Sequence, residues 1–136
     1  MKISYLFTII VGLLYQGCDA QHEPWPKTKN WRLYPGEGQA VFSFPEDSLK
    51  TTRNHLLNQD SIQFYLEKMQ PMPADRTPTW MGAYLASYES GDGKINKVEI
   101  GVYGGYFYDV SSDKYFSLPR QFIRAWQKFI VRNIPD

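Results

Sequence analysis

The sequence predicts a single α+β domain in which a small antiparallel sheet of three to four strands is packed by two to three helices. The length of 136 residues suits one compact domain, and 43% hydrophobic and 16% aromatic residues are too many for a disordered chain. Two strand-like runs, 80–90 and 94–110, flank the turn sequence Gly91-Asp92-Gly93, which is typical of a β-hairpin. A helical pattern of apolar residues follows Pro119.

The first residues have the order of a secretory signal peptide. Lys2 precedes an almost uninterrupted apolar run from Tyr5 to Tyr15. This run has about a dozen residues, whereas a membrane-spanning helix needs about twenty. Residues 1–17 are therefore predicted to be a signal peptide, and residues 18–30, which are rich in proline and lysine, are predicted to be a tether. The domain itself is predicted over 31–136, with Trp25 and Trp31 as candidates to dock onto it.

Gly17 and Cys18 resemble the end of the lipobox of bacterial lipoproteins. The resemblance covers only these N-terminal residues, and no domain family is recognised. It implies that Cys18 is acylated and anchors the protein to the lipid bilayer of a cell envelope, facing the periplasm, with the inner and the outer membrane both open. The alternatives are a secretory signal cleaved near Ala20 and an uncleaved anchor. All three place the domain outside the cytoplasm.

Charge and cysteine content exclude several classes of function. The chain has 15 Lys and Arg against 14 Asp and Glu, so it lacks the strongly basic character of a nucleic-acid-binding protein. Cys18 is the only cysteine, so the mature domain has no disulfide, no thiolate metal site and no cysteine nucleophile. A protein partner must therefore be recognised by shape and by local charge.

Between residues 31 and 79 we expect one strand, two short helices and a loop. The strand covers 40–44 and follows a turn at 35–38. The first helix starts at Glu46 and carries apolar residues up to Leu57, and the second starts at Asp60 and carries apolar residues up to Met69. Three prolines predict an exposed loop over 70–79.

The hairpin is predicted to pair Ser90 with Ile95, which places Leu85 opposite Ile100 on the core face. A third strand over 114–118 follows a turn at 111–113. In this register the opposite face carries a flat aromatic surface in which each ring lies over a glycine or a long polar side chain. Its members are Trp80, Tyr84, Tyr88 and Tyr103. The alternative is that a neighbouring segment covers these rings.

The last helix is predicted to run from Pro119 to about Asn133, with its apolar stripe covering the core face of the sheet. Its basic residues recur every four positions and form one exposed strip, which we call the basic ridge: Arg120, Arg124, Lys128 and Arg132. Such a strip is either a solvated face or a contact for anionic lipid headgroups or an acidic protein surface.

The sequence carries no convincing catalytic or metal-binding pattern. The segment 91–96 resembles the middle of an EF-hand loop, but its flanks are strand-like and Tyr88 occupies the first ligand position. His55 has no neighbour that would complete a catalytic pair, and a pairing of Glu89 with Glu99 remains only as a candidate glycosidase-like site. No metal, cofactor or catalytic residue is predicted.

These observations favour a non-enzymatic protein-binding module, most simply an inhibitor or immunity protein that occludes a toxin or an envelope enzyme. The aromatic surface would supply the anchors, Arg76 the rim and the basic ridge the charge complementarity. An accessory lipoprotein of a secretion or surface-assembly system is the first alternative. A small envelope hydrolase built around Glu89, Glu99 or His55 is the second.

Overall fold

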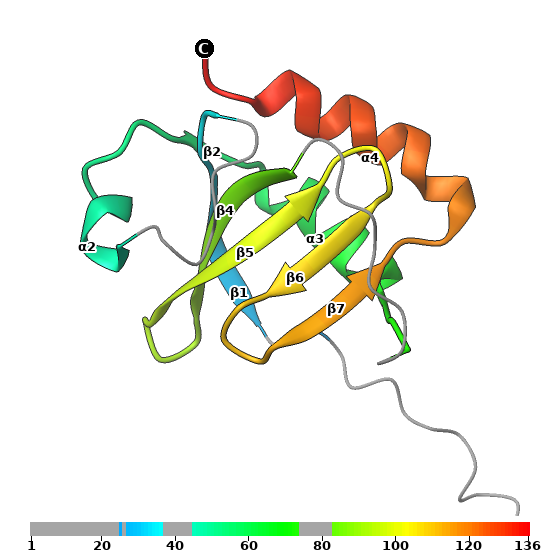
Figure 1. Cartoon of the computed structure of the whole chain (residues 1–136), viewed down its shortest axis with the longest axis horizontal. Coiled ribbons are helices and arrows are strands. Elements are labelled where there is room, and N and C mark those ends of the chain that lie inside the picture. Colours follow the sequence, from blue (N-terminus) through cyan, green and yellow to red (C-terminus); the bar gives the residue numbers. More distant parts are fainter. Residues whose placement is uncertain (1–24, 26, 37–44, 74–82) are drawn as a thin grey trace, which may run out of the picture.

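The structure is a computed structural model that describes residues 25, 27–36, 45–73 and 83–136, shown in colour in Figure 1. This part of the chain forms a seven-stranded sheet of order β2-β1-β4-β5-β6-β7-β3, in which each neighbouring pair is antiparallel. The strands are β1 (Thr28–Leu33), β2 (His55–Leu56), β3 (Gln70–Pro71), β4 (Ala83–Ser90), β5 (Ile95–Gly101), β6 (Tyr106–Asp109) and β7 (Lys114–Ser117). The helices are α2 (Glu46–Leu49), α3 (Gln59–Lys68) and α4 (Arg120–Asn133). The α+β class is confirmed, but the sheet is larger than predicted.

Both edges of the sheet are two-residue strands that the sequence analysis missed. β2 lies where a helix was expected to continue to Leu57. That helix, α2, ends at Leu49, and beyond it the Thr52 hydroxyl donates to the Ser48 carbonyl and the Asn54 amide donates to the Thr52 carbonyl. β3 lies within the predicted loop over 70–79. A proline is tolerated there because an edge strand has one side without a partner.

β1 begins inside the segment predicted to be a tether. Thr28 and Lys29 pair with Ser90 and Glu89 of β4, so the ordered domain starts before residue 31. Trp25 also packs on the core, with its ring 4.5 Å from that of Phe116. The docking of Trp25 and Trp31 is thus confirmed, and part of the segment that was predicted to be a tether belongs to the folded domain. The expected strand over 40–44 and the residues 1–24 lie outside the described residues.

The predicted strand over 94–110 is two strands. A turn over 102–105 separates β5 from β6, and Gly105 adopts a φ of 64°, in the left-handed region that favours glycine. β6 then pairs with both β5 and β7. The predicted strand at 114–118 and the final helix are confirmed, and α4 begins directly after Pro119.

The β4–β5 register differs by one residue from the prediction. Glu89, not Ser90, pairs with Ile95, and the Ser90 N–H donates to the Lys94 carbonyl, which closes a three-residue loop. Gly93 has a φ of 82°, as the last residue of such loops commonly does. Because strand side chains alternate between faces, this shift places Tyr84, Ala86 and Tyr88, which were predicted to point outward, on the core face.

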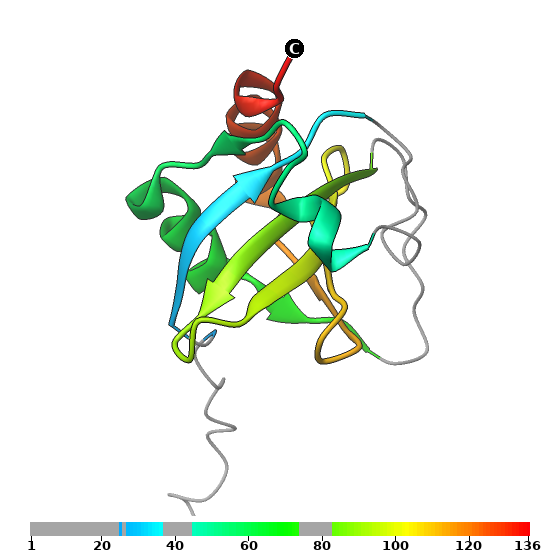
Figure 2. The ribbon, with the colours of Figure 1, turned by 90° about the vertical axis from the view of Figure 1, so that its left-hand side faces the viewer.

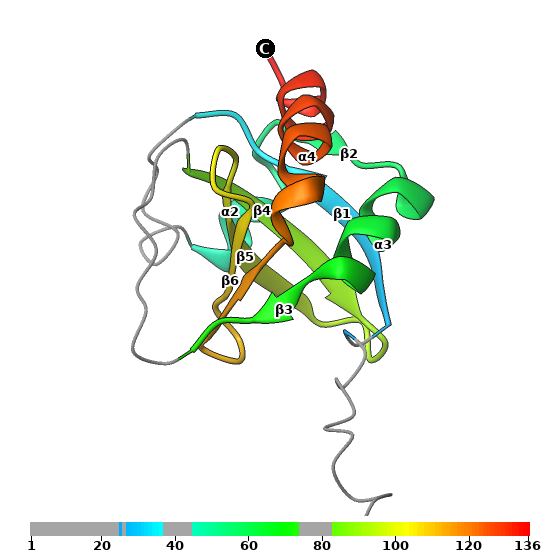
Figure 3. The same ribbon diagram turned by 90° about the vertical axis from the view of Figure 1, so that its right-hand side faces the viewer.

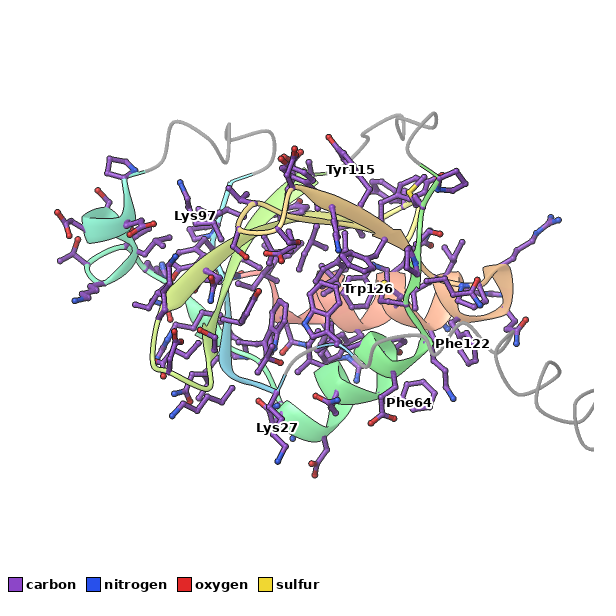
Figure 4. All side chains as sticks on the ribbon, turned by 90° about the horizontal axis from the view of Figure 1, so that it is seen from below. Lys27, Phe64, Lys97, Tyr115, Phe122 and Trp126 are labelled. Atoms are coloured by element: carbon purple, nitrogen blue, oxygen red, sulfur yellow. The ribbon has the colours of Figure 1, made fainter. Side chains whose placement is uncertain are left out.

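The sheet is strongly twisted, and its two faces are covered differently (Figures 2 and 3). α3 and α4 cover one face, where Trp31, Val98, Phe107, Trp126 and Ile130 belong to a single buried cluster. Figure 4 shows Trp126 of α4 directed into this layer. A smaller cluster of Tyr34, Leu49 and Leu85 lies on the other face, under α2.

Candidate protein-binding groove

The predicted aromatic surface does not exist as a continuous face. Tyr88 is only 3% exposed and stacks on Trp31 at 4.8 Å between ring centroids, because the observed register turns it into the core. Tyr84 is half-buried against the same core. Tyr103 is 60% exposed, in the turn between β5 and β6. Trp80 and Arg76 lie outside the described residues.

The basic ridge is present as predicted. α4 buries Trp126 and Ile130, and all four basic residues of the ridge are exposed on its other side. Pro119 precedes the helix and its carbonyl accepts the Phe122 N–H, which fits the tolerance for proline at a helix start. The Gln127 amide donates to the Tyr103 carbonyl at 2.8 Å and fixes α4 against the β5–β6 turn.

An open groove of about 520 Å³ runs between α3 and α4 and includes half of the basic ridge. Both helices contribute to it, and its lining residues are Asp60, Ser61, Phe64, Tyr65, Ala125, Lys128, Phe129 and Arg132. The floor is aromatic, since the rings of Tyr65 and Phe129 stack at 5.4 Å. The groove thus combines apolar area with two of the predicted cations.

Phe64 is the most unusual residue of this groove because it is a large apolar side chain left 47% exposed. Its ring contacts Tyr65 at 5.3 Å and Phe122 at 5.8 Å, and the Lys68 ammonium lies 5.5 Å from the ring centroid. Figure 4 shows the labelled Phe64 and Phe122 together beside α3 and α4. A partner that covers Phe64 would therefore meet a supported aromatic ring.

The groove carries an excess of positive charge. Lys128 and Arg132 line the α4 side, whereas Asp60 at the start of α3 supplies one carboxylate on the other side. Arg120 and Arg124 extend the positive strip along the exposed side of the helix. An acidic protein segment that carries an apolar side chain would match both properties, because interface anchors are typically aromatic and arginine residues.

Sequence reasoning missed the role of Phe64. The periodic pattern indicates the apolar stripe of α3, whose buried members are Ile62, Tyr65 and Leu66. Phe64 falls on the polar side of this helix. A large aromatic residue on the polar side of an amphipathic helix is the signal that could have pointed to the groove.

The candidate catalytic carboxylates are not brought together. Glu99 pairs with Leu85, and Glu89 lies four residues further along β4, so their backbone positions are about 13 Å apart at the usual rise per strand residue. Glycosidase carboxyl groups lie about 5–9.5 Å apart. Glu89 instead accepts a hydrogen bond from the Asn30 amide and lines a polar cavity of about 320 Å³ with Arg32. Burial raises the pKa of Glu99, and His55 is exposed in β2.

The EF-hand-like segment is a hairpin turn. The Asp92 carboxylate accepts hydrogen bonds from the Ser90 hydroxyl and the Lys94 N–H, and these bonds lower its pKa. Within the described residues, no three His, Cys, Asp or Glu side chains gather as a metal site would require. Asp92 therefore stabilises the turn between β4 and β5.

Among the helices of the described residues, none combines the length and the apolar character that crossing a membrane requires. Comparison of the chain with protein-family models, with curated proteins and with solved structures found no match.

Proposed function

We propose that this chain is a lipid-anchored protein of a bacterial envelope that acts as a non-enzymatic protein-binding module. Within that class, we propose an inhibitor or immunity protein that occludes a toxin or an envelope enzyme. The groove between α3 and α4 is the observation that carries this proposal. It places the exposed ring of Phe64 beside Lys128 and Arg132, which is the composition of an interface anchor.

The chemistry of the groove supports one class of partner. The aromatic floor fits an apolar side chain, and the surrounding cations fit carboxylates on either side of it. The partner surface is therefore acidic with a projecting apolar residue. The positive strip continues beyond the groove to Arg124 and Arg120, so carboxylates along one helix or strand of the partner could face the whole ridge.

The proposal is tested by capture followed by a functional measurement. The full-length protein in detergent serves as bait for envelope extracts, and the retained protein is identified and assayed for its toxic or enzymatic activity. Charge reversal by the double variant Lys128→Glu, Arg132→Glu should abolish capture, and Phe64→Ser should weaken it at least tenfold. Added wild-type protein should suppress the activity of the captured partner.

A matched control separates groove contacts from net charge. The double variant Lys50→Glu, Arg53→Glu changes the net charge by the same amount at exposed positions outside the groove, and it should capture the partner normally. Equal capture by both double variants would contradict the proposed groove. A partner that binds through the groove but keeps its full activity would instead favour an accessory lipoprotein of a secretion or surface-assembly system.

The anchor is tested separately at Cys18. The Cys18→Ser variant should either leave the membrane fraction or accumulate as an unprocessed precursor, because serine cannot be acylated in place of the cysteine thiol. Unchanged processing together with unchanged membrane association would contradict lipid anchoring. This result would not affect the groove, whose variants are measured in detergent.

A further inference from the structure

The two ends of the sheet differ in the turns and helices that lie at them. At one end lie the start of β1 and the β4–β5 turn, since Thr28 pairs with Ser90. The β6–β7 turn lies at this end too, because the Val110 N–H donates to the Lys97 carbonyl near the start of β5. We call this the hairpin end. α4 follows the far end of β7 and packs against the β5–β6 turn, so it lies at the opposite end (Figures 1–3).

The chain enters the domain at the hairpin end. Trp25 precedes β1 there, and its ring packs into the core through edge contacts with Tyr88, Phe107 and Phe116, with ring centroids 4.5 to 6.4 Å apart. Only six residues separate Cys18 from Trp25 in the sequence. Seven residue steps span at most about 25 Å when fully extended. An acyl anchor at Cys18 would therefore hold the hairpin end close to the bilayer.

α4 is held over the other part of the sheet. The eight residues of β4 span about 26 Å, and the bond from the Gln127 amide to the Tyr103 carbonyl ties α4 to the β5–β6 turn at the far end of β5. The basic ridge is on the exposed side of this helix, whereas the chain leaves the domain toward Cys18 at the hairpin end. The hairpin end is therefore the part of the described domain that lies nearest along the chain to an anchor at Cys18.

The exposed surface of the hairpin end has a surplus of lysine. Among the described residues, Lys27, Lys29, Lys94 and Lys114 are exposed there, against the exposed aspartates Asp92 and Asp113 and the half-exposed Glu89. Asp113 also accepts a hydrogen bond from the Tyr108 hydroxyl at 2.6 Å. Lysines close to a bilayer are attracted to anionic headgroups within about a Debye length, about 8 Å at physiological ionic strength.

We propose that the hairpin end of the domain docks on anionic lipid headgroups through its lysines, so that α4 and the groove face away from the membrane. This inference rests on the proposed acylation of Cys18. It assigns different partners to the two basic surfaces: lipid to the lysines of the hairpin end, and protein to the basic ridge. For the basic ridge, the sequence allows either a lipid or a protein contact, and this proposal favours the protein contact.

The orientation is measured with the full-length lipoprotein in vesicles of phosphatidylethanolamine and phosphatidylglycerol. Acylation consumes the thiol of Cys18, so a cysteine introduced elsewhere is the only reactive thiol. Gly91→Cys places a fluorophore at the hairpin end, where no atom lies within 4 Å of a side chain added at residue 91. Arg124→Cys is the matched position on the exposed side of α4. A nitroxide on the lipid headgroups is the quencher.

We expect quenching at residue 91 to exceed quenching at residue 124 at least threefold. Replacing phosphatidylglycerol by phosphatidylcholine, or Lys27, Lys29 and Lys94 by glutamine, should reduce the quenching at residue 91. Equal quenching at both positions, stronger quenching at residue 124, or no effect of lipid charge would overturn the proposal. Protein that does not float with the vesicles would instead overturn the lipid anchor, so the two failures are distinguishable.

Discussion

Two buried tryptophans of the core differ in whether the indole N–H has a hydrogen-bond partner. We therefore expect the same substitution to change the stability of the protein by different amounts at the two positions. Trp31 and Trp126 are both 0% exposed. The Trp31 indole N–H donates to the Thr28 hydroxyl at 2.8 Å. In the described part of the chain, the indole nitrogen of Trp126 is buried without a hydrogen-bond partner. Substitution of each by phenylalanine removes the same atoms, so the packing losses are similar and largely cancel in the comparison.

The hydrogen bonds determine the difference. Trp31→Phe removes a buried hydrogen bond and leaves the Thr28 hydroxyl, in a residue that is 7% exposed, without its donor. This adds about 1–3 kcal/mol to the loss of stability. Trp126→Phe removes an unsatisfied donor and should recover about 1–3 kcal/mol. The two variants should therefore differ by at least about 2 kcal/mol in the free energy of unfolding, with Trp31→Phe the less stable.

Urea denaturation of both variants measures this difference directly, provided that their m-values agree. At about 4 °C per kcal/mol, the melting temperatures should differ by about 8 °C. The variant Thr28→Val is the control, because it should reproduce the polar part of the Trp31→Phe loss without changing the ring. Equal destabilisation by Trp31→Phe and Trp126→Phe would refute the assignment of an unsatisfied indole.

Three further predictions follow from the fold. Burial raises the pKa of Tyr88 from 10.0 to about 12. The unfolded chain therefore loses this proton first, and the free energy of unfolding should fall by about 2–3 kcal/mol between pH 10 and 12. Urea titrations across this range should show a smaller fall for Tyr88→Phe. Gly105→Ala should lower the free energy of unfolding by about 1–2 kcal/mol, because φ at this residue is 64° and the new methyl group would lie 3.1 Å from Ile123. Gly91→Ala, the control, should leave the thermal unfolding of the protein nearly unchanged. Asp109→Ala should cost about 2–3 kcal/mol in the same assay, since Asp109 accepts bonds from Tyr88, Ser111 and Ser112.

The sequence predicted elements with strong local patterns and missed those defined by distant partners. α3 and α4 follow from their apolar stripes. β2 and β3 have only two residues each, and they become strands only because β1 and β7 offer free edges. Two residues carry no periodicity, so their pairing could not be predicted from local sequence.

The predicted aromatic face differs from the structure mainly because of a single loop residue. A four-residue loop from Gly91 to Lys94 was assumed, whereas the chain uses three residues and places Gly93 in the left-handed region. The polar side chains of Ser87 and Glu89 are a signal for the observed register, since they belong on the face away from the main core. The basic ridge was predictable because it depends only on the periodicity of one helix.

The two-residue edge strands also bear on how the protein behaves at high concentration. A long unpaired edge offers a template for strands of other molecules, which leads to aggregation or amyloid. Here one edge is β2, and the other is β3, where Pro71 lacks an N–H to donate. In the described part of the chain, the outermost strands on both sides are therefore short, and they offer little backbone for the strand of a neighbouring copy to pair with.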